Sequence, residues 1–163
     1  MRIAFAMMLW AVSAFAQDQS AAAAAACGPP NTSFDVKLDK SQHPLAQPEP
    51  GKARIYFVQE IGEVSCLGGC VTGKIGIDGA WVGANRRNSY FSVSVEPGEH
   101  HLCANPGPLV ALAHFTAEAG KVYYFRMRFF SFERRLFDFD AVDSDQGKHL
   151  IASYPLSVSH PAP

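Results

Sequence analysis

The chain has 163 residues, of which 48% are hydrophobic and 18% are charged, and its formal net charge is -1. A chain of this length can bury one core without help from a metal, so a single main domain and no cofactor are predicted. A charge so close to zero argues against a nucleic-acid partner, because such proteins bind phosphates through many Lys and Arg contacts.

The first 16 residues have the pattern of a secretory signal peptide. Arg2 gives a short positive region, Ile3–Val12 is an apolar run, and Ala14 and Ala16 are the small residues that a signal peptidase requires. The apolar run is shorter than the roughly 20 residues that span a bilayer. An uncleaved anchor or a buried helix is the alternative. We expect cleavage before Gln17, export to the periplasm or the exterior, and no transmembrane segment in the mature chain.

Four cysteines would remain after cleavage, namely Cys27, Cys66, Cys70 and Cys103. An even number of cysteines behind an export signal favours disulfides, and four cysteines allow three pairings. We favour Cys66–Cys70, whose intervening glycines can turn sharply, together with Cys27–Cys103, which would tie the N-terminal arm to a strand. The alternative is a lipoprotein modified at Cys27, but no apolar run directly precedes that residue.

Residues 17–51 are predicted to form a spacer and an arm outside the main domain. Ala21–Ala26 is a low-complexity tract that we expect to be disordered or processed. Phe34–Leu38 alternates apolar and charged residues, which predicts a short strand. Asp39–Gly51 contains three prolines and is typical of an extended linker, because proline fixes φ and donates no backbone hydrogen bond.

The main domain is predicted to span residues 52–157, with a tail at 158–163. Within it, Ser89–Val95 alternates apolar and polar side chains, which indicates a sheet with one buried face. Asp78-Gly79 is a typical hairpin turn between two such runs. Asp143–Tyr154 predicts a short helix that Ser144 could cap. The fold class is therefore an all-β antiparallel sandwich of about seven strands with a short C-terminal helix. The other predicted strands are Ala53–Glu60, Lys74–Asp78, Trp81–Gly83, Glu99–Ala104, Leu109–Ala117 and Lys121–Phe130.

Five short motifs follow one another through this domain: Gly51–Phe57, Ile77–Gly83, Asn88–Phe91, Glu96–Leu102 and Ala119–Phe125. In sequence and order they resemble the bacterial domain-of-unknown-function family 2846. The Asp-Gly-x-x-Val-Gly and Pro-Gly-x-His patterns are also similar to the PEGA type of surface β-module. The resemblance implies an exported bacterial β-domain and supplies no catalytic residues.

Three histidines, His100, His101 and His114, are the weak candidates for a metal site. Imidazole is a common zinc ligand, and Cys103 lies on the same strand face as His101. However, adjacent residues of a strand point to opposite faces, which separates His100 from His101. The chain also lacks the spaced Cys and His frameworks of zinc sites. No metal site is therefore predicted.

The Cys66–Cys70 pair is the other candidate for chemistry, as a redox centre. Thiol oxidoreductases place two residues between their cysteines near a helix N-terminus, whereas this pair has three residues in a glycine-rich loop. A structural disulfide is the favoured interpretation. No catalytic residue is assigned.

For binding, the candidate contact residues are Trp81, Arg86, Arg87 and Tyr90, because aromatic and arginine side chains are favoured at binding sites. Packing in the core is the favoured alternative for Trp81. The partner would be another envelope protein or a glycan. The sequence thus favours a non-catalytic binding or structural module of the cell envelope. A metal-dependent or thiol-based envelope enzyme is the alternative.

Overall fold

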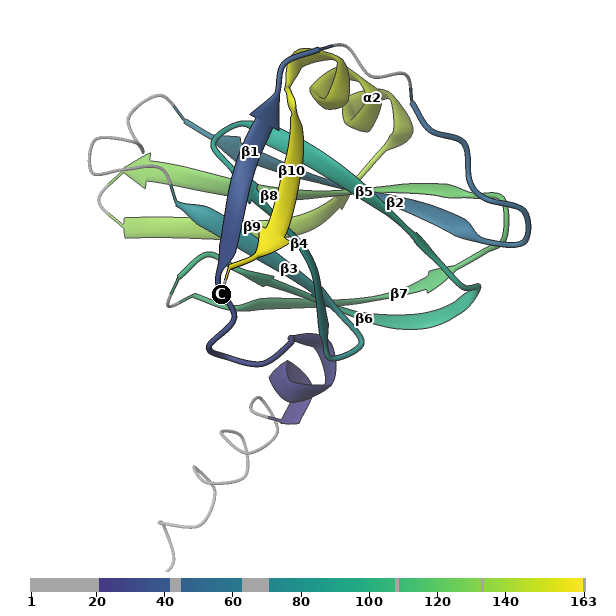
Figure 1. The fold of residues 1–163 in the computed structure, drawn as a ribbon, viewed down its shortest axis with the longest axis horizontal. Coiled ribbons are helices and arrows are strands. Elements are labelled where there is room, and N and C mark those ends of the chain that lie inside the picture. The colour runs from purple at the N-terminus through teal and green to yellow at the C-terminus, as the bar shows by residue number, and fades with distance from the viewer. Residues whose placement is uncertain (1–20, 42–44, 63–70, 108, 133, 163) are drawn as a thin grey trace, which may run out of the picture.

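The computed structural model describes residues 21–41, 45–62, 71–107, 109–132 and 134–162, which form two packed β-sheets (Figure 1). The larger sheet has the strand order β1-β10-β5-β2-β8-β9, and the smaller sheet has the order β4-β3-β6-β7. This confirms the all-β sandwich with a short C-terminal helix. The described part contains ten strands rather than about seven, because β9 and β10 were not predicted and β1, predicted as part of the N-terminal arm, joins the larger sheet.

The strands of the larger sheet are β1 (Phe34–Asp39), β2 (Ala53–Ile61), β5 (Ser89–Val95), β8 (Val122–Phe132), β9 (Arg134–Val142) and β10 (Leu156–Pro161). Those of the smaller sheet are β3 (Thr72–Ile77), β4 (Ala80–Arg86), β6 (Gly98–Asn105) and β7 (Ala111–Ala117), and the helix is α2 (Ser144–Ser153). Most neighbouring strands are antiparallel, but β2 pairs with β8, and β10 with β5, in parallel.

The turn between β3 and β4 is the predicted hairpin. Asp78 has φ of 50° and Gly79 has φ of 83°. Positive φ at both central residues is the mark of a type I′ turn, whose twist matches that of the flanking strands. The Asp-Gly signal therefore places the chain reversal correctly.

The main core lies between the sheets and is built from alternate residues of the strands. Phe91 and Val95 of β5 face it, as predicted, together with Phe57 of β2. Phe57 contacts Phe91 and Phe125, with ring centroids 5.4 and 6.1 Å apart. Aromatic contacts of this kind add to the free energy of burial in a sandwich core.

A second, smaller core lies on the outer face of the larger sheet. Here Leu150 and Ile151 of α2 cover Tyr56, Tyr90 and Tyr124. Because α2 covers this face, Tyr90 is only 4% exposed although it alternates with core residues of β5. The helix is capped by Asp143, which accepts hydrogen bonds from two backbone N–H groups, rather than by the predicted Ser144.

β1 and most of β10 lie outside the predicted 52–157 domain but belong to the larger sheet. β1, the predicted short strand, pairs antiparallel with β10 along its whole length. Ser157 and Ser159 of β10 then bond to the carbonyl and N–H of Ala84, which satisfies part of the open edge of β4. No helix of the described residues has the length and apolar character needed to span a membrane.

The proline-rich segment before β2 also lies against this sheet. The Tyr56 hydroxyl accepts from the N–H of Ala46 at 2.7 Å and donates to its carbonyl at 3.2 Å. Arg54 donates to the carbonyl of Gln47 at 3.2 Å. The described part of the expected linker is therefore held by side chains of β2.

Candidate functional site

The outer face of the four-stranded sheet carries the candidate site, and residues 21–33, here called the N-terminal strap, lie across it. Residues 21–26 are helical, and the N–H of Cys27 donates to the carbonyl of Ala23 at 2.7 Å. Figure 1 shows this helical turn at the lower edge of the molecule, beside β4 and β6. The tract expected to be disordered or processed is thus folded in the structure.

Two glycines allow the strap to approach the sheet closely. A Cβ atom on Gly76 of β3 would lie 2.7 Å from the carbonyl oxygen of Ala26. A Cβ atom on Gly28 would lie 2.6 Å from Cγ of Trp81. The Trp81 indole N–H also donates to the carbonyl of Pro29 at 2.7 Å. The strap therefore lies against bare backbone, with Trp81 packed beside it.

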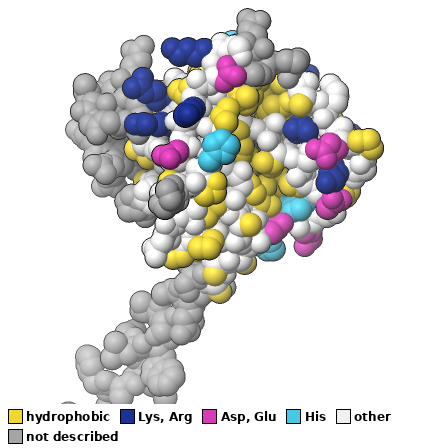
Figure 2. Space-filling view, viewed as in Figure 1, with side chains coloured by type: hydrophobic (Ala, Val, Ile, Leu, Met, Phe, Trp, Pro, Cys, Tyr) yellow, Lys and Arg dark blue, Asp and Glu magenta, His cyan; other side chains and the backbone are white. Residues whose placement is uncertain are grey.

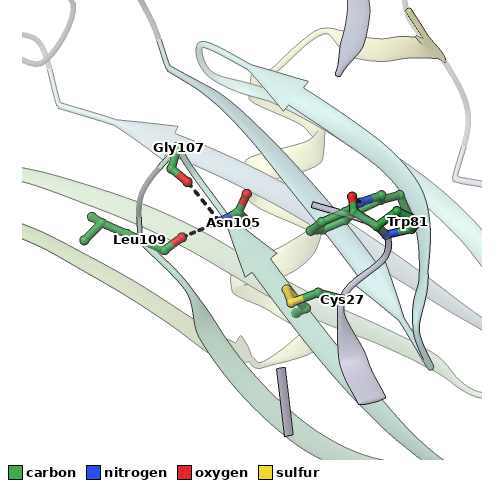
Figure 3. The surroundings of a disulfide bond; sticks show 7 residues. Cys27, Trp81, Asn105, Gly107 and Leu109 are labelled. Carbon is green, nitrogen blue, oxygen red and sulfur yellow. Dashed lines mark hydrogen bonds between the residues drawn. A yellow bond between two sulfur atoms is a disulfide. The ribbon is translucent and has the colours of Figure 1, made fainter. Parts of the chain in front are cut away.

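A disulfide fixes the strap covalently to β6. Cys27 and Cys103 are bonded with a Cα–Cα distance of 5.2 Å, and Cys103 is fully buried. This confirms one of the two favoured pairings, whereas Cys66 and Cys70 lie outside the described residues. A Cys27 sulfur in this bond cannot form the thioether of a lipoprotein. Figure 3 shows Cys27 close to Trp81.

Lys74 completes the contact between the strap and β3. Its ammonium donates to the carbonyl of Thr32 at 3.0 Å and lies 4.4 Å from the centroid of the Trp81 ring. Burial lowers the pKa of this ammonium. The contact is a cation–π interaction, which is stronger where water is partly excluded. Trp81 thus packs against the strap rather than in the main core.

The turn between β3 and β4 is linked to β6 by the side chain of Asp78. One carboxylate oxygen accepts from the His101 backbone N–H at 2.8 Å. The other lies 2.6 Å from Nδ1 of His100. The Nε2 atom of His100 lies 2.8 Å from the carbonyl of Glu96. With an acceptor at each ring nitrogen, His100 is held in the orientation that suits the doubly protonated imidazolium.

The positive charge of His100 and the negative charge of Asp78 stabilise each other. Burial opposes protonation of His100, but the Glu96 carbonyl and the Asp78 carboxylate outweigh it and raise the pKa of His100. Burial likewise opposes the charge of Asp78, but its bonds to the His101 N–H and the His100 ring keep the pKa of Asp78 below its usual range. The turn is thus anchored to β6 by a charged pair.

His101 and His114 face each other on the outer side of the sheet. They occupy directly opposed positions of β6 and β7, and their ring centroids are 4.6 Å apart at an interplanar angle of 74°. His100 points the other way and stacks on Phe115 at 5.6 Å. The prediction that His100 and His101 lie on opposite faces is therefore confirmed. Among the described residues, no group of three His, Cys, Asp or Glu side chains is placed to hold a metal.

At the far end of β6, Asn105 orders the connection to β7. Its amide donates to the carbonyl of Gly107 at 3.0 Å and to that of Leu109 at 2.7 Å (Figure 3). Val110, directly before β7, is half exposed.

Comparison with protein-family models gives one match, over residues 49–137, to the family described as Protein of unknown function (DUF2846). The match covers more than half of the 163 residues. The chain belongs to this family. No curated protein and no solved structure matches it. Asp78, His101, Cys103 and His114 lie inside the matched region of this DUF2846 protein, whereas Cys27 lies outside it.

The four binding candidates do not form one surface in the structure. Trp81 lies at the start of β4, and Arg86 and Arg87 lie at its end, where both are exposed. Tyr90 is buried beneath α2. Sequence reasoning grouped these residues by closeness along the chain, but β4 carries Trp81 away from the others. The histidine pair was missed as a pair because its register depends on the β6–β7 pairing.

The arginines of β8 are neutralised by β9. Arg126 lies 3.1 Å from Asp140 and 3.5 Å from Glu60, and Arg128 lies 3.1 Å from Asp138. Such cross-strand pairs stabilise the hairpin and leave little net positive charge for an anionic ligand. Elsewhere on the surface, Figure 2 shows cationic and acidic side chains side by side on the right of the view, so charges of both signs are mixed there as well.

Proposed function

We propose that this DUF2846 protein is an exported, non-catalytic binding or structural module of the bacterial cell envelope. The Cys27–Cys103 disulfide is the single observation that carries the proposal. Structural disulfides persist in the periplasm and outside the cell and are rare in the reducing cytosol. Here the bond joins the segment after the predicted signal peptide to a fully buried position of the domain.

The position of the bond fits with export of the chain. Cleavage before Gln17 would leave the helical residues 21–26 and Cys27 at the beginning of the mature protein. The strap would then hold the new N-terminus against the four-stranded sheet. The disulfide would then keep the N-terminal segment folded against the domain without help from another protein.

The outer face of the four-stranded sheet is the surface that we assign to the partner. The strap covers the part of this face around Trp81 and Lys74, so the partner would contact the strap, the partly exposed edges of these two side chains and the exposed His114. Aromatic and cationic groups on a rigid sheet suit another envelope protein or a glycan. The buried disulfide leaves no thiol at Cys27 or Cys103 for a thiol-based reaction.

The test is fractionation of a bacterium that expresses either the full chain or a variant that lacks residues 2–16. Thiols are alkylated at lysis, and intact mass and disulfide peptides are recorded. We expect the full chain outside the cytoplasm, beginning at Gln17 and with Cys27 bonded to Cys103. The shortened variant should stay in the cytoplasm with both thiols alkylated. A full chain found in the cytoplasm with residues 1–16 still attached would contradict the proposal.

A further inference from the structure

The pair formed by His101 and His114 has the arrangement of a chelate. The two residues are directly opposed across the β6–β7 pair, where Cβ atoms lie about 4.5–5.5 Å apart. The rings stand edge to face with centroids 4.6 Å apart. Two imidazoles this close can direct one nitrogen each to a common point above the sheet.

The rings are open to solvent and to a metal ion. The side chain of His101 is 43% exposed, and His114 is exposed. Among the described residues, the ring of His114 makes no hydrogen bond, so both of its nitrogens are open to a ligand. The imidazole nitrogens of this pair are therefore accessible to a metal ion from solvent.

Asp78 lies beside the ring of His101. Its Oδ1 is 3.7 Å from Nδ1 of that ring, which is beyond hydrogen-bond distance but places the carboxylate on the Nδ1 side and leaves Nε2 as the atom free to ligate. Metal-ligating histidines are commonly oriented by a carboxylate at their other ring nitrogen. The backbone N–H of His101 also bonds to Asp78, so the strand and the carboxylate keep a fixed relation.

The backbone beneath the pair is held on both sides. The N–H of Asp78 donates to the carbonyl of His101 at 3.0 Å. Cys103, two residues along β6, is tied to the strap by its disulfide. Two ligands on a rigid sheet lose little freedom when they bind an ion, and this favours chelation.

We propose that His101 and His114 form a two-imidazole chelate for a late first-row transition-metal dication, with Cu²⁺ preferred and water completing its coordination. Imidazole suits Cu²⁺, Ni²⁺ and Zn²⁺, whereas Ca²⁺ and Mg²⁺ require oxygen ligands. The affinity should follow the order Cu²⁺ above Ni²⁺ and Zn²⁺. The pair provides two ligands, so the site would be open to exchange with solvent. This inference does not depend on the proposed export.

The experiment titrates the mature chain, with any free thiols alkylated, with each metal ion alone. The heat of binding is measured, and the Cu²⁺ complex is examined by electron paramagnetic resonance for coordinated nitrogen. We expect one site per chain, with His101→Ala and His114→Ala each weakening Cu²⁺ binding at least tenfold. The double variant should be no weaker than either single variant, because a chelate is lost with its first ligand.

His149→Ala removes an exposed histidine from α2 and is the matched control. It should bind Cu²⁺ as the wild type does, and thermal unfolding without metal should be the same for His114→Ala and the wild type. Three results would overturn the site. These are no Cu²⁺ binding by the wild type, affinity retained within twofold in His114→Ala, or an equal loss in His149→Ala. Preference for Ca²⁺ or Mg²⁺ over Cu²⁺ would overturn the assigned ligand class.

Discussion

The two outer faces of the sandwich are covered in different ways. On the larger sheet, α2 packs noncovalently over a layer of tyrosines through Leu150 and Ile151. On the smaller sheet, the strap lies against Gly76 and Trp81 and is bonded covalently at Cys103. α2 is held by burial of apolar area, whereas the strap combines close backbone approach with a crosslink.

This difference indicates which face depends on the environment of the protein. Packing of α2 requires only water and the folded sheet. The strap requires an oxidising compartment, because reduction would remove its covalent bond. The face that carries Trp81 and the two opposed histidines is therefore the one whose structure depends on the redox state of its surroundings.

Loss of the disulfide should have the largest effect. Cys27→Ser opens a crosslink between residues 76 positions apart in sequence. A loop of this size is expected to contribute about 4 kcal/mol by restricting the unfolded chain. Urea unfolding of wild type and variant, both without reductant, should show this loss. Addition of reductant should then destabilise the wild type by more than the variant, which keeps only the predicted Cys66–Cys70 bond. Equal midpoints for the two proteins without reductant would show that the crosslink adds no stability.

Gly147→Ala should disrupt the packing of α2 against the larger sheet and so destabilise the protein. The added Cβ would lie 2.8 Å from Cβ of Tyr124, and the ring of that tyrosine would be closer still. Overpacking of this kind costs about 1–3 kcal/mol, although alanine favours helices. Lys148→Ala, at an exposed position of the same helix, is the control and should not destabilise the protein. A stabilised Gly147→Ala protein would mean that α2 does not contact Tyr124 in solution.

Gly76→Ala should act on the strap face with a smaller effect of about 1–2 kcal/mol, because the strap can shift away. Trp81 is the only tryptophan after residue 16, so its fluorescence reports on this contact. We expect a red-shifted emission in Gly76→Ala. Gly62→Ala is the control, since among the described residues its added Cβ would meet the Phe129 carbonyl alone, at 3.9 Å. Unchanged emission in Gly76→Ala would contradict the docked strap.

Alkaline pH should destabilise the α2 face before the strap face, and this is the smallest of the expected effects. Burial raises the pKa of Tyr56, Tyr90, Tyr124 and Tyr154, all of which lie on the α2 side. Raised folded-state pKa values mean that their stabilisation is complete below the ordinary tyrosine pKa near 10 and is lost as pH rises through the folded values. Hydrogen exchange at rising pH should therefore show α2 opening before the strap.

The variant Tyr90→Phe should flatten this alkaline dependence, because it removes one ionisable group without removing the ring. Absorbance at 295 nm follows tyrosinate formation in the same samples. Ionisation of all tyrosines near pH 10 with α2 still protected would show that these hydroxyl groups are in contact with water.

The sequence was sufficient where neighbouring residues determine the structure. Alternation in Ser89–Val95 indicated which side chains enter the core, and Asp78-Gly79 predicted the hairpin. The Cys27–Cys103 bond was also favoured in advance, from the export signal and the even number of cysteines. The family resemblance agreed with the domain that the family model matches.

The rest depends on contacts between distant segments. Tyr90 looked available on the polar face of its strand, but α2, more than 50 residues later, buries it. Ala21–Ala26 has no side-chain pattern of its own and folds against the sheet only because Cys27 and Gly76 bring it there. The His101–His114 pair exists through strand register, which alternation alone does not specify.

Disulfide mapping of the mature protein from the envelope fraction, after alkylation and without reduction, tests the crosslinked strap and its export together. We expect an N-terminus at Gln17 and a crosslinked peptide that contains Cys27 and Cys103. Alkylated Cys27 and Cys103, or an N-terminus at an acylated Cys27, would contradict this expectation.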